Sequence, residues 1–367
     1  MSLRRVTATD AIAQLAAFDA VIDARSESEH AEDHLPGAVN WPVLNDAQRA
    51  DIGTQYKQAS PFDARKRGAV MAARNIADHV EMRAAALTRS WKPLVYCWRG
   101  GQRSGSLALV LDQIGFQVSV LEGGYREFRR AVLAELETLP AAFTWRVLCG
   151  RTGSAKSRLL LALAAQGAQV LDLEALACHR GSVLGPLPGQ PQPTQKAFET
   201  AVWRALRGFD AARPVFVEGE SRTIGRLRVP ERVLEQLRAA PCLQLQMPLD
   251  ARVAFLLHDY AHFVDDVDSF CTRLDALREL RGAAVVAAWQ AEARAGRIAG
   301  VVRELLTLHY DPVYEKSMQR NFVHFAQATP VRLADGGPAT LTAAAATLAA
   351  DGAAAQIPPA VCLHLPA

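Results

Sequence analysis

The sequence has no apolar run long enough to cross a membrane, and its first residues do not form a secretory signal. No run of about 20 apolar residues occurs in the chain. The start, MSLRRVTATDAIAQL, lacks the apolar stretch and the small-residue cleavage site of a signal peptide. We therefore expect a cytoplasmic protein that has no membrane partner.

Paired cysteines are also missing. The six cysteines, at positions 97, 149, 178, 242, 271 and 362, include no C-x-x-C pair. This spacing argues against a zinc ribbon and against a disulfide framework, so cysteine predicts no metal site. A lone thiol in such a chain stays reduced and is available as a nucleophile.

No charge of one sign dominates the chain. The 41 Lys and Arg residues nearly balance the 38 Asp and Glu residues, and the formal net charge is +3. Arginine is nevertheless clustered at 65–67, 126–130 and 222–228. Such clusters contact phosphates in some proteins, but most are solvated surface, so charge alone does not predict a nucleic-acid partner.

Short apolar segments alternate with helical ones along most of the chain. Half of the residues are hydrophobic, as is typical of a soluble globular protein. Strands that alternate with helices form parallel sheets, and functional groups gather at the carboxyl ends of such strands. The expected strands lie within residues 18–25, 93–98, 117–124, 143–150, 168–174, 213–220 and 242–249.

The chain of 367 residues is too long for one ordinary hydrophobic core, so we predict two domains. Residues 1–140 form an α/β domain that closes with a helix ending at Pro140. Residues 141–335 form a second α/β domain with a helical C-terminal part. The alanine-rich tail, 336–367, is expected either to pack as a helix on the outside or to be loosely held.

The segment VYCWRGGQRSGS (95–106) carries one cysteine, Cys97, from the end of an expected strand into a loop of glycines and arginines. Backbone N–H groups in such a loop form an anion-binding concavity, and a helix starting near Ser104 adds its positive end. Arg99 and Arg103 add full charges, so all three effects favour the thiolate and Cys97 is the predicted catalytic residue. Glycines at 100 and 101 supply the required backbone angles. The rest of this thiol loop is the predicted cradle: Trp98, Arg99, Gly100, Gly101, Gln102, Arg103 and Ser104.

The segment GRTGSAKS (150–157) lies between an expected strand and an expected helix, which is the context of a phosphate-binding loop, or P-loop. It matches G-x-x-x-x-G-K-[ST] except that Ala155 replaces the glycine before Lys156. Alanine fits there only with a negative φ or with mild strain, which weakens the case for nucleotide hydrolysis more than the case for phosphate binding. Lys156 would pair with phosphate charge, and Ser157 would bind Mg²⁺ or a phosphate oxygen. The predicted phosphate-binding residues are Gly150, Thr152, Gly153, Ser154, Ala155, Lys156 and Ser157.

Three carboxylates follow strands of the second expected sheet. Asp172 ends one strand, and Glu218 and Glu220 end another, where a carboxylate can organise Mg²⁺. Solvated strand ends would place the same residues there. We predict the three as candidate Mg²⁺ or phosphate groups, although spacing alone establishes no metal site.

Two resemblances emerge from these motifs. The thiol loop, together with DARSESEHAEDHLPGAVNWP (23–42), resembles the rhodanese-like domains, whose cysteine carries a transferable sulfur or selenium. In that resemblance Asp23 and Arg25 form a structural ion pair. A rhodanese-like domain followed by a P-loop NTPase-like domain resembles the tRNA 2-selenouridine synthase family. This chain departs from the family pattern at Arg151 and Ala155. The resemblance extends to about residue 320 and includes the stretches 51–69, 172–185, 216–230 and 310–317.

The resemblance implies a transferase that acts on 2-thiouridine at the wobble position of the tRNA anticodon loop. Geranyl diphosphate first alkylates the sulfur to give S-geranyl-2-thiouridine, and selenophosphate then supplies the selenium of 2-selenouridine. No tightly bound cofactor is implied; Mg²⁺ is a candidate, and an enzyme that supplies selenophosphate is a candidate partner. His179 and Arg180 are candidate phosphate or tRNA contacts. The candidate tRNA face comprises Arg222, Arg226 and Arg228, with the 65–67 cluster.

Two other functions are compatible with the residues. One is a sulfurtransferase fused to a kinase-like domain that uses ATP or GTP on a small molecule. The other is a non-catalytic binding module with a degenerate P-loop, which Ala155 suggests. Cys97 argues against the second, because a binding module has no need of a thiol in an anion cradle.

Overall fold

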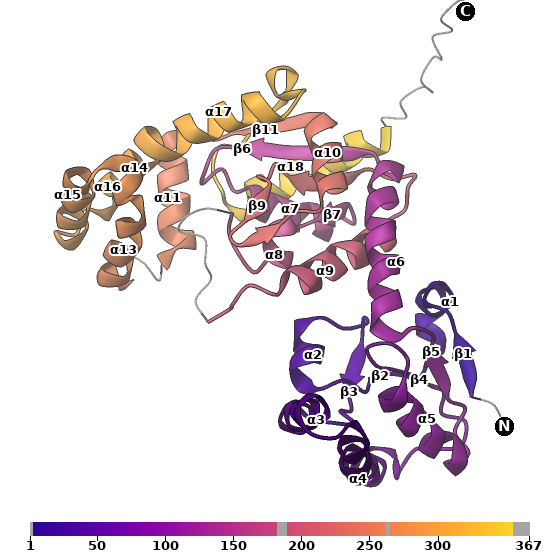
Figure 1. The fold of residues 1–367 in the computed structure, drawn as a ribbon. Helices are drawn as coiled ribbons and strands as arrows, with labels where there is room; N and C mark the ends of the chain where they lie inside the picture. Colours follow the sequence, from indigo (N-terminus) through magenta and orange to yellow (C-terminus); the bar gives the residue numbers. More distant parts are fainter. Residues whose placement is uncertain (1–2, 182–188, 262–264, 355–367) are drawn as a thin grey trace, which may run out of the picture. The chain divides into compact units, whose positions relative to one another are not determined.

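A computed structural model of the chain describes residues 3–181, 189–261 and 265–354, and these divide into two compact units (Figure 1). Unit 1 contains the chain up to Glu137 together with Pro193–Arg204. Unit 2 contains Thr138–Gln192 and the chain from Ala205 onward. Each unit is built on a five-stranded sheet whose paired strands are all parallel, which confirms the predicted α/β class.

The sheet of unit 1 places the strand that precedes Cys97 at its centre. Its order is β1-β5-β4-β2-β3. All four residues of β4 are buried, as expected for a strand of a parallel sheet covered on both faces. The strands are β1 (Arg4–Val6), β2 (Ala20–Asp23), β3 (Ala38–Asn40), β4 (Pro93–Tyr96) and β5 (Ser119–Leu121).

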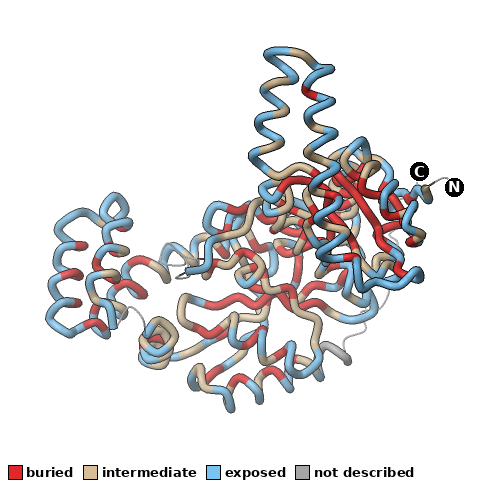
Figure 2. Tube along the Cα trace, turned by 90° about the horizontal axis from the view of Figure 1, so that it is seen from below, coloured by how far each residue is buried: buried red, intermediate tan, exposed pale blue. Residues whose placement is uncertain are grey.

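Helices of unit 1 join these strands. Burial follows the strands and the helix faces turned toward them, and long stretches of helix are exposed (Figure 2). Helix α5 is capped by Gly115, whose φ of 108° is a left-handed conformation that glycine favours. The helices are α1 (Ala8–Ala13), α2 (Glu27–Glu32), α3 (Asp46–Gln58), α4 (Pro61–His79), α5 (Gln102–Ile114) and α6 (Gly124–Thr138).

The sheet of unit 2 has the order β12-β11-β6-β8-β7. From the central strand β6 the chain passes to β7 and β8 on one side, and later to β11 and β12 on the other. In open parallel sheets a ligand site forms where the strand order switches in this way, outside the carboxyl ends of the strands. The P-loop follows β6 at this point. The strands are β6 (Trp145–Gly150), β7 (Gln169–Leu171), β8 (Val215–Glu218), β11 (Cys242–Gln246) and β12 (Thr329–Arg332).

Helices and a small hairpin complete the sheet region of unit 2. Strands β9 (Thr223–Ile224) and β10 (Leu227–Arg228) form an antiparallel pair after β8. The helices are α7 (Lys156–Ala165), α8 (Leu173–Leu176), α10 (Glu231–Ala239), α11 (Leu249–Asp259) and α18 (Pro338–Ala354). Within the predicted tail, Leu341, Ala345 and Leu348 of α18 are buried in the same core as Leu159 and Leu163 of α7. This part of the tail is therefore a packed helix; residues 355–367 lie outside the described chain.

A helical part of unit 2 has a core of its own, which includes Phe270, Leu274, Trp289 and Val301. Its helices are α13 (Val267–Leu274), α14 (Arg278–Arg281), α15 (Ala283–Arg294), α16 (Ile298–Glu304) and α17 (Asp311–Asn321). None of the helices in the described ranges has the length and apolar character needed to span a bilayer.

The segment Pro193–Arg204, which includes most of helix α9 (Gln195–Arg207), packs in unit 1 although the sequence analysis grouped it with the second domain. Lys196 forms an ion pair with Glu32 (2.7 Å), and Thr200 Oγ1 donates to Asp33 (2.9 Å). The indole of Trp203 donates to Glu135 (2.8 Å). Polar contacts of this kind produce no periodic pattern in a sequence. The spacing of apolar residues therefore did not predict that this segment packs in unit 1.

Candidate functional site: a thiol loop and a P-loop cleft

Cys97 lies at the carboxyl end of β4, directly before the loop that leads into α5. Its side chain is buried, and the Ser104 hydroxyl donates a hydrogen bond to its sulfur (3.1 Å). The sequence placed the helix start near Ser104, but α5 begins at Gln102 with Gly101 as its N-cap. The first turn of α5 therefore includes Ser104, which brings the positive helix end close to the thiol.

The backbone of the thiol loop presents free donors. No N–H from Trp98 to Ser104 donates to another residue of the described chain. The loop is fixed instead through its carbonyls, since Tyr125 N donates to Cys97 O (2.8 Å) and Arg126 N to Trp98 O (3.1 Å). Unpaired successive N–H groups at a helix start form an anion site, so this geometry supports the predicted cradle.

Two glycines allow the loop to cross the start of α6. Gly100 has a φ of +64° and Gly124 a φ of +62°. A Cβ on Gly124 would lie 2.2 Å from Cys97 O and 2.6 Å from Gly100 N. Gly101, by contrast, has a φ of −99° and no neighbour within 4 Å of an added Cβ. The required glycines are thus Gly100 and Gly124; the prediction named Gly101 and missed Gly124.

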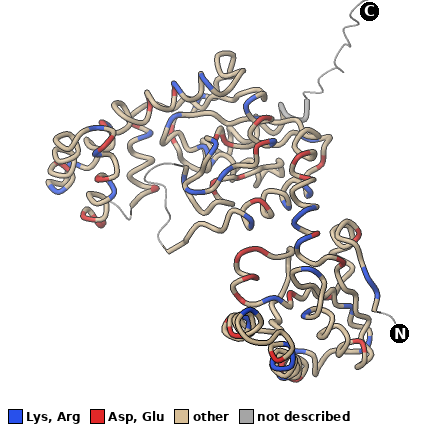
Figure 3. Tube along the Cα trace, viewed as in Figure 1, with Lys and Arg blue, Asp and Glu red and all other residues tan. Residues whose placement is uncertain are grey.

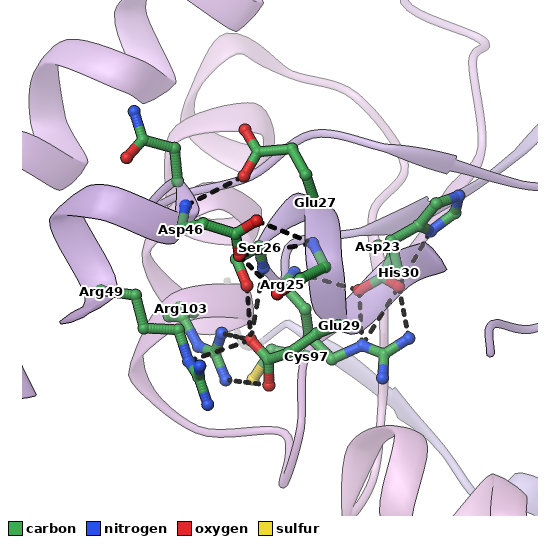
Figure 4. A network of polar contacts seen from close by, with 12 residues as sticks. Asp23, Arg25, Ser26, Glu27, Glu29, His30, Asp46, Arg49, Cys97 and Arg103 are labelled. Atoms are coloured by element: carbon green, nitrogen blue, oxygen red, sulfur yellow. Dashed lines mark hydrogen bonds and ion pairs between the residues drawn. The ribbon is translucent and has the colours of Figure 1, made fainter. Parts of the chain in front are cut away.

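The arginines of the thiol loop do not act as the sequence analysis expected. Arg103 pairs with Glu29 (2.5 Å), which Arg49 also approaches at 3.2 Å (Figure 4). Its charge is therefore compensated by a carboxylate. Arg99 is exposed and forms no ion pair in the described ranges. Backbone N–H groups and the helix end, rather than arginine charge, dominate the cradle.

A buried ion pair is hydrogen-bonded to β4, the strand that precedes the thiol loop. Asp23 and Arg25 are fully buried and meet at 2.6 Å, which confirms the predicted structural pair (Figure 4). The Tyr96 hydroxyl donates to Asp23 (2.9 Å), and His30 contacts the same carboxylate. Burial would raise the pKa of Asp23, but hydrogen bonds from His30 and Arg25 and the charge of Arg25 outweigh it, and the pKa is lowered.

The P-loop in unit 2 keeps the conformation of a phosphate-binding loop despite its alanine. Ala155 has φ 61° and ψ 30°, a left-handed geometry, so the strained alternative of the prediction holds. Among the described residues, no acceptor receives the N–H groups of Gly153, Ala155, Lys156 or Ser157. These donors therefore remain available to a phosphate at the start of α7.

A tyrosine that the sequence analysis did not select closes the base of the P-loop. The Tyr314 hydroxyl accepts a hydrogen bond from Gly150 N (2.6 Å). The Lys156 ammonium donates to Gly150 O (2.7 Å) and lies 5.6 Å from the centre of the Tyr314 ring. Tyr314 thus holds both the first residue of the loop and the lysine. It belongs to the stretch YDPVYEKS, whose likeness to a family was the only signal for it.

Four carboxylates gather next to Ser157. The Ser157 hydroxyl donates to Glu174 (2.9 Å), and Glu174 N donates to Glu218 (2.9 Å). Glu218 is fully buried, and its second oxygen, Oε2, has no partner in the described chain. Asp172 caps α8 by accepting from Ala175 N (2.8 Å). The sequence analysis named Asp172, Glu218 and Glu220 but missed Glu174.

Burial and mutual repulsion raise the pKa values of this acidic cluster. Burial, followed by the charges of Asp172, Glu220 and Glu174, raises the pKa of Glu218 well above its ordinary value. Burial and the charge of Glu174 raise the pKa of Glu220 to about 8. Burial also raises the pKa values of Asp172 and Glu174. A cation would relieve this repulsion, because it favours the ionised carboxylates.

The cluster suits Mg²⁺ in part. In the ranges that the structure describes, no three His, Cys, Asp or Glu side chains form a ready-made metal cage. Mg²⁺ usually takes one or two carboxylates and completes its shell with phosphate oxygens and waters. Ser157, Glu174 and the unpartnered oxygen of Glu218 fit that incomplete set.

A cleft of about 840 Å³ opens beside the P-loop, and we call it the P-loop cleft. Its polar lining includes Lys156, Ser157 and three carboxylates of the acidic cluster, Asp172, Glu174 and Glu220. One wall is apolar, and two of its side chains are more than half exposed, Leu161 (56%) and Val313 (55%). The apolar wall consists mainly of Leu161, Phe255, Leu256, Tyr310, Val313, Met318 and Phe322.

The predicted phosphate or tRNA contacts divide between the cleft and its surroundings. His179, Arg180 and Arg222 line the P-loop cleft. His179 Nδ1 accepts from Gly181 N (3.1 Å), and Arg180 pairs with Asp259 and lies over the Tyr260 ring at 4.4 Å. Burial lowers the pKa of His179, which favours the neutral ring.

The other predicted tRNA contacts lie on the β9–β10 hairpin and on helix α4. Arg226 donates to Gln192 O (2.6 Å), and Arg228 lies in β10, beyond the residues that line the cleft. In unit 1, Lys66 pairs with Asp63 (2.7 Å) and Arg67 with Asp51 (2.8 Å). Figure 3 shows that Lys and Arg are interspersed with Asp and Glu in both units. The structure therefore supports Arg222 as a cleft residue more directly than it supports a tRNA face.

The remaining predicted cysteine roles agree with the structure where it is described. Cys149, Cys242 and Cys271 are buried, Cys178 is half-buried, and all are free thiols. Cys362 lies outside the described residues.

Comparison with known proteins gives a consistent result. Residues 7–131 match the family model described as rhodanese-like domain, and residues 143–277 match the one described as tRNA 2-selenouridine synthase AAA domain. The tRNA 2-selenouridine synthase of Alcanivorax borkumensis is 36% identical over 246 residues, 65% of this chain and 66% of the relative. That of Marinobacter nauticus is 29% identical over 351 residues, 88% of this chain and 92% of the relative. That of Shewanella halifaxensis is 33% identical over 265 residues, 71% of each chain. The chain therefore belongs to the tRNA 2-selenouridine synthase family.

Proposed function

We propose that this protein is a tRNA-modifying transferase that converts 2-thiouridine at the wobble position to 2-selenouridine. The P-loop cleft transfers a geranyl group from geranyl diphosphate to the sulfur, and the thiol loop serves the exchange of that sulfur for selenium from selenophosphate. The observation that carries the proposal is the presence, in one chain, of two anion cradles with different surroundings. One holds a buried thiol, and the other opens on a large cleft with an apolar wall.

The first step uses the P-loop as a seat for a leaving diphosphate. The thiocarbonyl sulfur attacks C1 of the geranyl group, the C1–O bond breaks, and diphosphate leaves with the electron pair. The free N–H groups of the P-loop and the Lys156 ammonium face the growing negative charge. Ser157 and Glu174, with Glu218, would hold Mg²⁺, which supplies further charge stabilisation to the diphosphate when bound.

The apolar wall of the P-loop cleft accommodates a hydrocarbon chain next to that seat. A volume of about 840 Å³ is within the usual range of small-molecule sites, a few hundred to about 1,000 Å³. Exposed apolar side chains such as Leu161 and Val313 gain from covering by a prenyl chain. An ordinary nucleotide kinase has no need of this wall, so it favours prenyl transfer over the kinase-like alternative.

The second step replaces sulfur with selenium at C2 of the uridine. Alkylation makes C2 electrophilic and turns the sulfur into a stable thiol leaving group. The Cys97 sulfur adds to C2, the C2–S bond to the geranylated sulfur breaks and geranylthiol leaves. Selenophosphate then adds to C2 through selenium, the bond from C2 to the Cys97 sulfur breaks, and water cleaves the Se–P bond and releases phosphate. Cys97 thus acts as a nucleophile at C2 and is regenerated as the thiol.

The uridine must leave the anticodon stack to reach either site. Anticodon loops are single-stranded, so extrusion of one base costs little. Recognition would then depend on stacking and phosphate contacts, and the proposal assigns one such contact to Arg222, which lines the P-loop cleft.

Omission of one co-substrate at a time tests the proposal. The full chain is incubated with tRNA that carries 2-thiouridine, and its nucleosides are analysed by mass spectrometry. Geranyl diphosphate alone should give S-geranyl-2-thiouridine, and addition of selenophosphate should convert it to 2-selenouridine. A protein that alters the nucleoside under neither condition contradicts the proposal, and the kinase-like alternative is then tested with ATP and GTP.

A further inference from the structure

A second pocket lies on the β11 side of the P-loop. It has a volume of about 750 Å³ and is formed at the carboxyl ends of β11 and β12. Strand register sets Gln246 beside Arg332 and Leu245 beside Gly150, the first residue of the P-loop. We call it the arginine pocket; its walls include Arg151, Gln244, Gln246, Met247, Arg332 and Leu333.

The charge of the arginine pocket is positive. Arg332 is exposed and forms no ion pair with any described residue, and the carboxylates nearest to Arg151 lie at 3.6 and 3.9 Å. A third arginine, Arg252, is buried and neutralised by Asp311 (2.6 Å). No carboxylate lines the pocket among the described residues. The uncompensated guanidinium of Arg332, next to Arg151 with its long ion pairs to Asp311 and Glu315, favours an anionic ligand, and phosphate suits the planar donors of both arginines.

A buried hydroxyl points to a missing partner at the same place. Ser154 is 1% exposed, and its Oγ has no hydrogen-bond partner in the described chain. It lines the arginine pocket as well as the P-loop cleft. Because a buried hydroxyl without a partner is unfavourable, a ligand atom that bonds to it would be stabilised.

The rest of the pocket is larger and less polar than a bare phosphate requires. Met247 and Pro248 offer apolar surface, and the side-chain amides of Gln244 and Gln246 offer donors and acceptors. Inorganic phosphate would occupy only a small part of about 750 Å³. A flat base has both an apolar face and a polar edge, so these walls match a base that is joined to a phosphate.

We propose that the arginine pocket binds a nucleotide, with its phosphate on Arg151 and Arg332 and its base against Met247 and Pro248. The amides of Gln244 and Gln246 face the edge of the base. The nucleotide comes either from the bound tRNA or from a free nucleoside phosphate, and both present the same chemistry to the pocket. This site goes beyond the two transfer steps, because binding there needs neither geranyl diphosphate nor selenophosphate.

Binding measurements with the full chain test this site and its ligand source. UMP, ATP and GTP are titrated by calorimetry, and an anticodon stem-loop RNA is titrated by gel shift. The variant is Arg332→Gln, and the matched control is Arg320→Gln, an exposed arginine of α17 that lines neither described pocket. Loss of a charge-assisted phosphate contact should weaken binding about tenfold or more, whereas the control should bind as the wild type does.

The outcomes separate the two sources. RNA binding that is weakened in Arg332→Gln, without binding of free nucleotides, assigns the pocket to tRNA. Free-nucleotide binding that is weakened in the same variant assigns it to a nucleoside phosphate. If all four ligands bind Arg332→Gln and the wild type equally, or if none binds the wild type, the proposal is wrong. Turnover plays no part in these titrations, so their failure leaves the proposed transfer steps standing.

Discussion

The thiol loop and the P-loop both offer backbone N–H groups to an anion, but their surroundings differ. Each follows a strand of a parallel sheet and leads into a helix with free N–H groups. In the thiol loop Arg103 pairs with Glu29, and the uncompensated Arg99 is exposed. The P-loop has Lys156 and four carboxylates beside it. One cradle therefore suits a single anionic atom on a thiol, and the other suits a multiply charged group with a cation.

Among the changes considered, loss of Lys156 should have the largest effect, which is on the rate of geranylation. An unchanged rate would contradict the difference drawn between the two loops. Lys156→Ala should lower the rate of geranylation by about 100- to 1,000-fold, as expected for removal of one charge-stabilising group from an active site. Nucleoside mass spectrometry at early times gives this rate. Lys92→Ala, an exposed lysine of unit 1 outside every predicted site, is the matched control and should leave the rate near that of the wild type.

The next largest effect should come from Gly124, where the thiol loop crosses the start of α6. Gly124→Ala puts a Cβ within 2.2 Å of Cys97 O at a positive φ, so unfolding by denaturant should show a loss of about 3 kcal/mol. Gly101→Ala has room for its Cβ and a negative φ. Equal stability of the two variants would show that the crossing does not constrain the loop.

Two variants of Tyr314 distinguish the role of its ring from the role of its hydroxyl. Tyr314→Ala removes the surface next to Lys156 as well as the bond to Gly150 N, and geranylation should fall about tenfold or more. Tyr314→Phe keeps the ring and should retain more of the rate. A positioning role predicts that kcat falls more than KM rises in Tyr314→Ala and that Tyr314→Phe partly rescues it; equal loss in both variants would contradict this.

The acidic cluster predicts that stability falls as the pH rises. The folded pKa of Glu220 is raised from an ordinary 4.5 to about 8, so its contribution to stability is full below about 4.5 and is lost as the pH rises toward 8. Thermal unfolding without Mg²⁺ should therefore show a falling Tm over this window, and Glu220→Gln should flatten the fall. Mg²⁺ should raise Tm most at high pH, where the carboxylates are ionised. A Tm profile unchanged by Glu220→Gln would show that this residue is not the titrating group.

The smallest effect concerns the alanine of the P-loop. Ala155→Gly relieves a left-handed alanine but increases the freedom of the unfolded chain, so a net gain in stability under about 1 kcal/mol is expected. Geranylation should persist in this variant. A marked loss of activity would show that the alanine side chain itself has a role.

The comparison also explains which features the sequence could predict. Strands such as β4 and β6, the cap at Gly115 and both loops were predictable, because apolar runs, glycine and lysine act locally. Glu174 and Tyr314 were missed, because Glu174 bonds to a residue 17 positions away and Tyr314 to one 164 positions away. Pairing of Arg103 with Glu29, 74 positions away, was equally invisible. What remained unpredicted was thus the set of long-range polar contacts that gives each loop its charge.

The central claim is that the two loops divide the reaction, and one experiment tests it most directly. Cys97→Ala and Lys156→Ala are each incubated with 2-thiouridine tRNA, geranyl diphosphate and selenophosphate, and the nucleosides are identified by mass spectrometry. The account predicts that Cys97→Ala accumulates S-geranyl-2-thiouridine, whereas Lys156→Ala leaves 2-thiouridine almost unchanged. Full conversion to 2-selenouridine by Cys97→Ala, or failure of both variants at the same step, would contradict it.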